Sequence, residues 1–211
     1  ATTLSSMGKP NGLRLSGVNR VSELNTGIRL DELVTKATFK LKVTYPQGMR
    51  HDQSFLRVYV NNQLAGMAQL KSDKAGVSHW MSIDLDPMLF TDFAPLRLEF
   101  DGTYDTTCLM PENPTLRFDI SADSKLEIES RPLTLVDDLA LLPAPFFDPR
   151  DSSRLELPFV LPQQKSHTLL KAAGVVGSWL GAQASYRQAA FELKQTIPDN
   201  RHSVVFSKGE N

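Results

Sequence analysis

From about residue 13 to residue 130, the pattern of apolar and polar positions is typical of strands. In the segment ATFKLKVTY, the apolar side chains from Phe39 to Tyr45 recur at every second position, so they share one face of a strand. The segment FLRVYVNNQLAGMAQL is typical of a hairpin, because Asn61 and Asn62 tolerate the positive φ of a tight turn. Further strands are expected in HWMSIDL, PLRLEFDG, TLRFDI and KLEIES. Turn signals every ~8–12 residues favour an antiparallel β-sandwich.

The pattern changes after Arg131. The segment DSSRLELPFVL is a strand candidate, and SHTLLKAAGVVGSWLGAQASY repeats apolar residues every three or four positions, which predicts a helix. Ser166 is placed to accept a hydrogen bond from the first turn of that helix as its N-cap. AAFELKQTI and HSVVFS add two strand candidates. Strand, helix and strand in this order predict the start of an α/β domain with at least one parallel pair.

We therefore expect an antiparallel β-sandwich over residues 12–132, followed over residues 133–211 by a linker and a truncated α/β domain. The first segment of the linker, LLPAPFFDPRD, should be held extended by its three prolines. Burying Phe146 and Phe147 should contribute about 1.5–3 kcal/mol each. We interpret them as domain-interface residues that pin the sandwich against the α/β domain; the alternative is a proline-rich linker with incidental phenylalanines.

Composition removes several classes of function. The net charge of −1 over 211 residues argues against a general nucleic-acid binder, which needs a basic surface. The single cysteine, Cys108, forms no internal disulfide and no CxxC metal site, and four scattered histidines indicate no metal centre. No apolar run approaches the ~20 residues of a spanning helix. The chain begins ATTLSSMGKP, without an initiator Met or signal peptide, so we expect a fragment of a longer protein.

Several segments, taken together, resemble the periplasmic B subunit of bacterial cellulose synthase, a family also named for binding cyclic di-GMP. The resemblance covers about residues 12 to 209, and the order of DELVTKA and PFFDPRD is its most specific part. The matching segments are DELVTKATFKLKVTY (31–45), LRVYVNNQLAG (56–66), LFTDFAPLRLEFDGTY (89–104), DDLALLPAPFFDPRD (137–151) and GSWLG (177–181).

The resemblance implies a cellulose-binding-like jelly roll followed by a flavodoxin-like α/β domain. It implies a non-catalytic periplasmic subunit that guides the nascent β-1,4-glucan across the periplasm and supports the catalytic membrane subunit of cellulose synthase. It also implies an anchor in the inner membrane through a C-terminal helix absent from this chain, and self-association. The residues themselves give no physical basis for a cyclic di-GMP contact, because no RxxxR-type arginine cluster stands beside a glycine-rich β motif, so cyclic di-GMP enters here as a name that the family carries.

Catalysis finds little support in the residues. Ser178 of GSWLG lies within the predicted helix rather than on a nucleophile elbow, and His51 beside Asp52 is no triad. The loop PQQKSHT lacks the glycines that close around phosphate, so we expect no flavin or other cofactor. Glycoside hydrolysis needs two carboxylates across a cleft. The available acids are Asp84, Asp86, Asp101 and Asp105.

Carbohydrate binding is the chemistry that fits best, because sugar rings pair an apolar face with hydroxyl edges and suit an exposed aromatic ring among polar groups. Alternation places Trp80 and Tyr59 on outer strand faces, and Tyr104 with Asp105 in a loop at one end of the sandwich. A protein contact and incidental packing are alternatives for these residues. Trp179 falls on the apolar stripe of the helix, which predicts a core or interface position.

The leading hypothesis is a non-catalytic, glucan-binding subunit of the cellulose synthase complex. A purely structural self-assembly module that makes no sugar contact is the second hypothesis. A sandwich-type polysaccharide hydrolase is the third.

Overall fold

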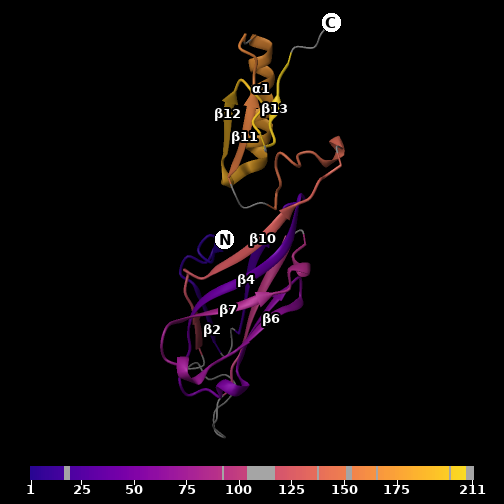
Figure 1. The fold of residues 1–211 in the computed structure, drawn as a ribbon. Coiled ribbons are helices and arrows are strands. Elements are labelled where there is room, and N and C mark those ends of the chain that lie inside the picture. The colour runs from indigo at the N-terminus through magenta and orange to yellow at the C-terminus, as the bar shows by residue number, and fades with distance from the viewer. Residues whose placement is uncertain are drawn as a thin grey trace. The chain divides into compact units, whose positions relative to one another are not determined.

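A computed structural model describes residues 1–16, 20–91, 93–103, 117–136, 138–150, 154–164, 166–199 and 201–207. The chain divides into two compact units. The first comprises Ala1–Ile28 and Glu32–Pro132, and the second comprises Arg29–Asp31 and Leu133–Asn211. Figure 1 shows the strands of the first unit in colours from indigo to salmon and most of the second unit in orange to yellow.

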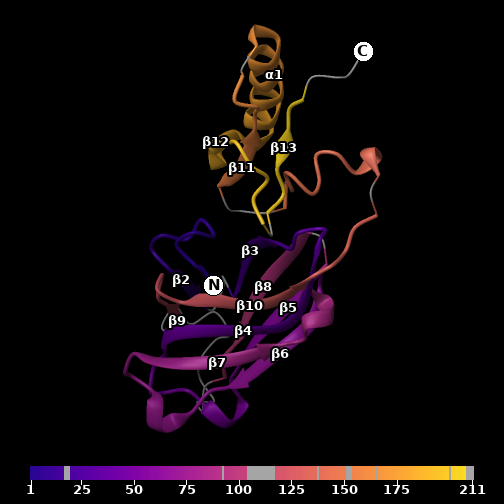
Figure 2. The same ribbon diagram turned by 45° about the horizontal axis from the view of Figure 1, so that its top comes forward.

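Two antiparallel sheets form the first unit (Figure 2). The first, called here the β4 sheet, has the order β1-β10-β4-β9-β2, with β7 paired to β4; the second, the β8 sheet, has the order β3-β8-β5-β6. The strands of the β4 sheet are β1 (Thr2–Thr3), β2 (Leu13–Ser16), β4 (Glu32–Thr44), β7 (His79–Leu85), β9 (Arg117–Ile120) and β10 (Lys125–Pro132). Those of the β8 sheet are β3 (Val21–Gly27), β5 (Phe55–Val60), β6 (Gln63–Gln69) and β8 (Phe93–Asp101). Short 3-10 turns lie at His51–Gln53, Ser72–Lys74 and Pro87–Leu89.

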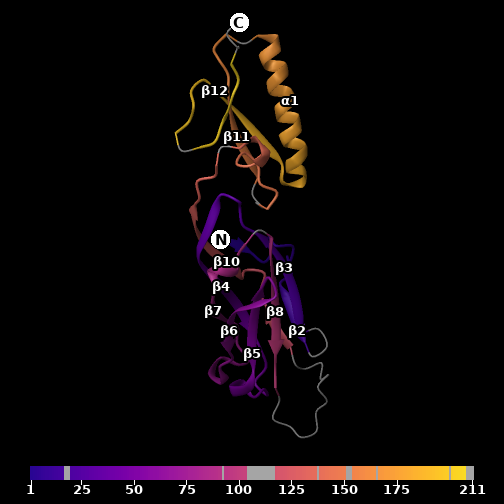
Figure 3. The same cartoon turned by 90° about the vertical axis from the view of Figure 1, so that its right-hand side faces the viewer.

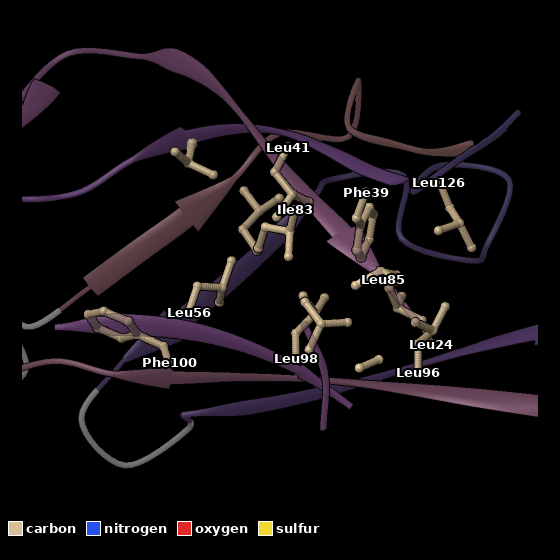
Figure 4. Packing of buried hydrophobic residues seen from close by; sticks show 14 of the residues in the cluster. Leu24, Phe39, Leu41, Leu56, Ile83, Leu85, Leu96, Leu98, Phe100 and Leu126 are labelled. Atoms are coloured by element: carbon tan, nitrogen blue, oxygen red, sulfur yellow. The ribbon is translucent and has the colours of Figure 1, made fainter. Parts of the chain in front are cut away.

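The hydrophobic core of this unit is built by the inward faces of both sheets. Phe39 and Leu41 of β4 are fully buried, and so are Leu56 of β5 and Leu98 of β8, which come from the other sheet (Figure 4). Each of these strands alternates buried with less buried residues, as the sequence pattern predicts. The predicted mostly antiparallel β-sandwich is therefore confirmed for the first unit.

The hairpin between β5 and β6 turns at Asn61 and Asn62, whose φ angles are 50° and 63°. Asparagine tolerates this left-handed region because its short polar side chain bonds locally. The Asn61 amide also donates to the carbonyl of Leu89 at 2.8 Å, which fixes the hairpin against the 3-10 turn at Pro87–Leu89. The hairpin prediction is confirmed.

Strand β6 approaches β7 of the other sheet closely at Gly66. A Cβ placed on Gly66 would lie 2.5 Å from the carbonyl oxygen of Asp84 and 2.8 Å from the Ile83 side chain. The neighbouring carbonyl of Ala65 accepts a hydrogen bond from the N–H of Asp86 at 3.0 Å. Gly66 is thus needed where the two sheets meet along this edge, because any side chain there would separate them.

The second unit contains a parallel sheet and one long helix. Strand β11 (Leu155–Val160) pairs in parallel with β12 (Ala189–Lys194) and with β13 (Val204–Val205), which confirms the predicted parallel pairing. Helix α1 (His167–Ala184) runs beside β11 and β12 (Figure 3). As predicted, the Ser166 hydroxyl accepts a hydrogen bond from the N–H of Leu169 at the start of the helix. Two further 3-10 turns lie at Leu139–Leu141 and Ser185–Arg187.

Two glycines of α1 differ in what surrounds them. A Cβ on Gly177 would make ordinary van der Waals contacts with Phe159 of β11, at 3.4 Å, and with Phe191 of β12, at 3.7 Å. A Cβ on Gly174 would meet nothing within 4 Å. Gly177 therefore faces the sheet, whereas Gly174 does not.

The proline-rich stretch is not extended, contrary to the prediction. The segment folds into consecutive turns, in which the N–H of Ala144 bonds the carbonyl of Leu141 and the N–H of Phe147 bonds that of Pro143. The Leu142–Pro143 and Ala144–Pro145 peptide bonds are cis. The physical reason is that the fixed φ of proline suits turns as well as an extended chain.

The two phenylalanines of this stretch belong to the hydrophobic core of the second unit. Phe147 is 5% exposed in a cluster with Leu155 and Leu157 of β11, and Phe146 packs against that cluster. Their role as domain-interface residues stays a prediction. Trp179 is 45% exposed, so the expectation that it lies in the core is wrong, whereas an interface role stays a prediction.

Candidate binding surface around Trp80

Trp80 stands on the outer face of the β4 sheet with its side chain 54% exposed. In the ladder between β7 and β4 it lies opposite Lys42, and the next outward residue, Ser82, lies opposite Lys40. Cross-strand partners in an antiparallel pair point to the same face. The indole therefore belongs to a polar surface, while Ile83 and Leu85 of the same strand are buried in the core.

A groove of about 440 Å³ opens on the same sheet. Lys42, the cross-strand partner of Trp80, is one of the residues that line it. Ser78, two residues before Trp80, also lines it. Cationic, anionic and hydroxyl groups face this groove together. Its lining residues are Asn11, Gly12, Leu13, Arg14, Lys42, Thr44, Ser78, Asp119, Ile120 and Ser121.

Local contacts hold the walls of the groove. The Arg14 guanidinium of β2 donates to the Asp119 carboxylate of β9 at 2.6 Å, and this hydrogen bond raises the pKa of Arg14. Gly12 has φ of +74°, and a Cβ there would clash with the carbonyl of Ile120. The backbone N–H of Lys42 donates to the buried Ser124 hydroxyl at 2.9 Å. Backbone contacts and hydrogen bonds therefore fix the walls of the groove, in addition to the ion pair between Arg14 and Asp119.

Charges of both signs alternate across the outer face of the β4 sheet. The carboxylate of Glu127 lies between Lys125, at 2.8 Å, and Lys40, at 2.7 Å. Hydrogen bonds from Lys125 and then Lys40 lower the pKa of Glu127 to about 2. On β7, the Asp84 carboxylate accepts a hydrogen bond from the hydroxyl of Thr38 at 2.9 Å. The surface around Trp80 thus offers many donors and acceptors with little excess charge.

Tyr59 lies on the other sheet, so the structure does not bring it together with Trp80. It belongs to β5 of the β8 sheet, opposite Arg97, whose guanidinium lies 4.0 Å from the centre of its ring. A cation over the ring occupies the face that a sugar would stack on. Tyr104 and Asp105 lie outside the described residues, as does Cys108.

The acids considered for hydrolysis have structural partners where the structure describes them. Asp84 bonds Thr38, Asp86 accepts from the N–H of Met88 at 3.0 Å, and Asp101 forms an ion pair with Arg57 at 2.9 Å. Asp105 lies outside the described residues. His51 approaches the carbonyl of Pro46 through Nε2 at 3.3 Å. In the described ranges, no three His, Cys, Asp or Glu side chains gather closely enough to hold a metal ion.

In the second unit, sequence reasoning missed Asp148. Its side chain is 2% exposed, and its carboxylate accepts hydrogen bonds from the backbone N–H and the guanidinium of Arg150. It also accepts one from the N–H of Leu30 at 2.7 Å. Burial acts to raise the pKa of Asp148, but the bonds from Arg150 and Leu30 outweigh it and leave the pKa below its ordinary value.

Comparison with known proteins identifies the family. The sequence model described as "Cellulose synthase BcsB, first CBM domain" matches residues 1–132, and "Cellulose synthase BcsB, first FD domain" matches residues 138–211. The chain belongs to the BcsB family. The resemblance expected from the sequence is thereby confirmed.

Curated relatives in the BcsB family cover almost the whole chain. A cyclic di-GMP-binding protein from Xanthomonas axonopodis pv. citri is 40% identical over 98% of this chain and 26% of its own length. The protein of that name from Pseudomonas fluorescens is 38% identical over 90% of this chain and 25% of its own length. The chain therefore spans about a quarter of these BcsB relatives.

Among solved structures, an acetyl xylan esterase from Butyrivibrio proteoclasticus is 10% identical over 88% of this chain and 43% of its own chain. Its TM-score of 0.29 is too low to support an argument. No helix in the described part of the chain combines the length and the apolar character that crossing a lipid bilayer requires.

Proposed function

We propose that this chain is a non-catalytic part of a cellulose synthase subunit, and that it contacts the β-1,4-glucan through the outer face of the β4 sheet around Trp80. Membership of the BcsB family, with its CBM domain over residues 1–132, supports an accessory role in cellulose synthesis. The observation that carries the glucan contact is an indole 54% exposed beside a polar groove of about 440 Å³.

The chemistry of the surface suits a sugar chain. The axial C–H groups of a glucose ring form an apolar face that stacks on indole, while its equatorial hydroxyls need donors and acceptors around the ring. Lys42, Ser78 and Asp119 present such groups from the groove. A single exposed aromatic should hold the chain weakly, with Kd in the millimolar range or roughly 4 kcal/mol. Weak contact suits a guide, because tight binding would stall a moving polymer.

Our proposal for the whole protein extends beyond this chain. We place it in the periplasm, anchored to the inner membrane by a helix that this chain does not include, where it would support the catalytic membrane subunit and self-associate. The first unit would be a jelly roll, and the parallel sheet of the second unit would begin a flavodoxin-like domain. Phe146 and Phe147 would contribute to the interface between the two domains. The family match over residues 138–211 supports the second domain.

The dinucleotide in the relatives' names is not part of the proposal. Cyclic di-GMP is named for the Xanthomonas and Pseudomonas proteins, of which this chain covers about a quarter. The RxxxR spacing of this sequence, from Arg150 to Arg154, is followed by the strand segment LELPFV, which contains no glycine.

Calorimetric titration of the chain with cellohexaose tests the glucan contact. We expect weak saturable binding that is lost, or weakened at least about tenfold, in Trp80→Ala, because stacking supplies most of a contact of this strength. Trp179→Ala is the matched control, since it removes an exposed indole from the second unit. Maltohexaose, with the same sugar but a different linkage, controls for shape.

Two results would overturn the proposal. One is a titration without heat at millimolar cellohexaose. The other is binding that Trp80→Ala and Trp179→Ala weaken equally.

A self-assembly module without sugar contact is the second candidate, and one feature favours it. Leu64, Met67 and Phe93 are each more than half exposed and belong to strands β6 and β8 of the β8 sheet. Exposed apolar residues gathered on one sheet are typical of protein contacts. Concentration-dependent sedimentation that disappears in Met67→Glu, together with a flat cellohexaose titration, would favour this candidate.

A further inference from the structure

The residues that line the groove beside Trp80 come from four neighbouring strands. Strands β7, β4, β9 and β2 follow one another across the β4 sheet (Figure 2). In the ladders, Thr44 of β4 lies opposite Asp119 of β9, and Asp119 lies opposite Arg14 of β2. All three line the groove, together with Ser78, which directly precedes β7. The groove therefore runs across the strands and not along them, because directly opposed residues share one face of a sheet.

Trp80 lies at one end of this row of residues, and Arg14 lies at the other. Trp80 of β7 is opposite Lys42, which is two residues before Thr44 on β4, so the row is slightly oblique. Three strand spacings of about 4.8 Å separate β7 from β2, which gives roughly 14 Å. A β-1,4-linked glucose residue advances its chain by about one strand spacing, so roughly four sugars would reach from the indole to the Arg14 guanidinium.

The charged groups along the row are paired with groups of opposite charge. The Arg14 guanidinium donates to Asp119 through Nε at 2.6 Å, and Asp119 also lies 3.5 Å from Arg117. Lys42 lies 3.4 Å from Asp123. These side chains are 31–68% exposed, so they remain accessible to a ligand. Charges of both signs suit the hydroxyls of a neutral sugar, which donate as well as accept, and give little net attraction for an anionic polymer.

A second direction from Trp80 leads along β7 to Ser82, whose cross-strand partner is Lys40. The Lys40 amine lies 2.7 Å from the Glu127 carboxylate, and its side chain is 43% exposed. Lys40 therefore resembles Arg14 as an exposed cation paired with a carboxylate, but it is not among the residues that line the groove. The two cations distinguish a glucan that crosses the sheet from one that follows a strand.

We propose that the glucan crosses the strands of the β4 sheet, stacked on Trp80 at one end and bound by Asp119 and Arg14 at the other. This inference rests on the proposed glucan contact, and it adds the direction of the chain, the number of sugars and Arg14 as a binding residue. The bond from Arg14 to Asp119 uses Nε, so the two Nη groups lie outside that bond and can donate to sugar hydroxyls. The Asp119 carboxylate has lone pairs to accept from them.

An NMR titration of the chain with cello-oligosaccharides of two to six sugars tests the direction. The Trp80 indole N–H should shift with every length, whereas the backbone signal of Arg14 should shift only with the longer oligosaccharides. Arg14→Gln should weaken cellohexaose binding at least about threefold, because hydrogen bonds from a charged donor are lost. It should leave cellobiose binding unchanged, because two sugars on Trp80 do not reach β2. Lys40→Gln is the matched control and should leave both affinities at the wild-type values.

The outcomes separate this inference from the proposal on which it rests. A Trp80 indole that cellohexaose leaves unshifted would show that the glucan contact itself is wrong. If the indole shifts, but Lys40→Gln weakens cellohexaose binding and Arg14→Gln does not, the glucan follows the strand and only the crossing direction is wrong. Equal weakening of cellobiose and cellohexaose by Arg14→Gln would also overturn the inference, because it would indicate a change in the sheet and not a contact with a distant sugar.

Discussion

The Asp148 carboxylate accepts a hydrogen bond from the backbone N–H of Leu30 at 2.7 Å, although 118 residues separate them in sequence. The same carboxylate is 2.8 Å from the Arg150 guanidinium and almost fully buried. One side chain therefore holds the Arg29–Asp31 segment to the turns that follow Phe147. A buried, fully bonded charge of this kind is costly to break, because its partners are left without compensation.

Replacing Asp148 with Ala should destabilise the second unit by about 3–5 kcal/mol, since the N–H of Leu30 loses its acceptor and Arg150 loses its hydrogen bonds to a buried carboxylate. Thermal unfolding read from Trp179 in a Trp80→Phe background measures that unit, because the two tryptophans lie in different units. Asp199→Ala removes an exposed acid of the same unit and should change little. Equal stability of both variants would contradict the assignment.

Acid should weaken the second unit through the same group. The folded pKa of Asp148 is below its unfolded value of about 3.9, so the carboxylate contributes stability above about pH 4. That contribution is lost as the pH falls through the lower folded pKa. Between pH 6 and pH 2, the free energy of unfolding should fall more steeply with decreasing pH in the wild type than in Asp148→Ala. Parallel pH dependences of the two proteins would contradict the role of Asp148.

Gly66→Ala should destabilise the first unit by about 1–3 kcal/mol or more, because the added methyl group would meet the Asp84 carbonyl and the Ile83 side chain. Gly174→Ala is the opposite case. Its methyl group meets nothing within 4 Å, and alanine favours a helix over glycine by about 1 kcal/mol, so the second unit should become more stable. Chemical denaturation of both variants measures the two changes in the free energy of unfolding, which should have opposite signs. A neutral Gly66→Ala would show that β6 and β7 are not in close contact.

Tyr45→Phe should cost about 1–2 kcal/mol in the first unit. The Tyr45 hydroxyl donates to the carbonyl of Lys71 at 2.9 Å and accepts from its N–H at 3.1 Å, so both backbone groups lose a partner. Burial raises the pKa of Tyr45, and its contribution to stability is therefore lost as the pH rises above about 10. Urea unfolding at pH 7 and pH 10.5 should show a smaller alkaline loss in Tyr45→Phe. Tyr59→Phe is the control, and it should keep the alkaline loss of the wild type.

Much of the fold could be predicted because its signals are local. Alternation from Phe39 to Tyr45 correctly predicted a strand with one buried face, and Asn61 and Asn62 correctly predicted a hairpin turn. The outward position of Trp80 followed from the inward positions of its strand neighbours. Each of these inferences needs only a few adjacent residues and the period of a strand.

The features that were missed depend on pairing across long stretches of sequence. Nothing near Asp148 indicates that its partner is the N–H of Leu30. The groove beside Trp80 combines Arg14, Lys42 and Asp119 from three strands, whose register no local pattern reveals. Helical spacing placed Trp179 on the apolar stripe, but spacing alone does not show how wide a stripe the sheet covers.

The indole signals of the two tryptophans test the central claim most directly. In an NMR titration with cellohexaose, the indole N–H of Trp80 should shift together with the backbone signals of Lys42, Ser78 and Asp119, while the indole of Trp179 stays in place. An unchanged Trp80 signal at millimolar cellohexaose, or shifts confined to the β8 sheet, would contradict a glucan contact on the β4 sheet.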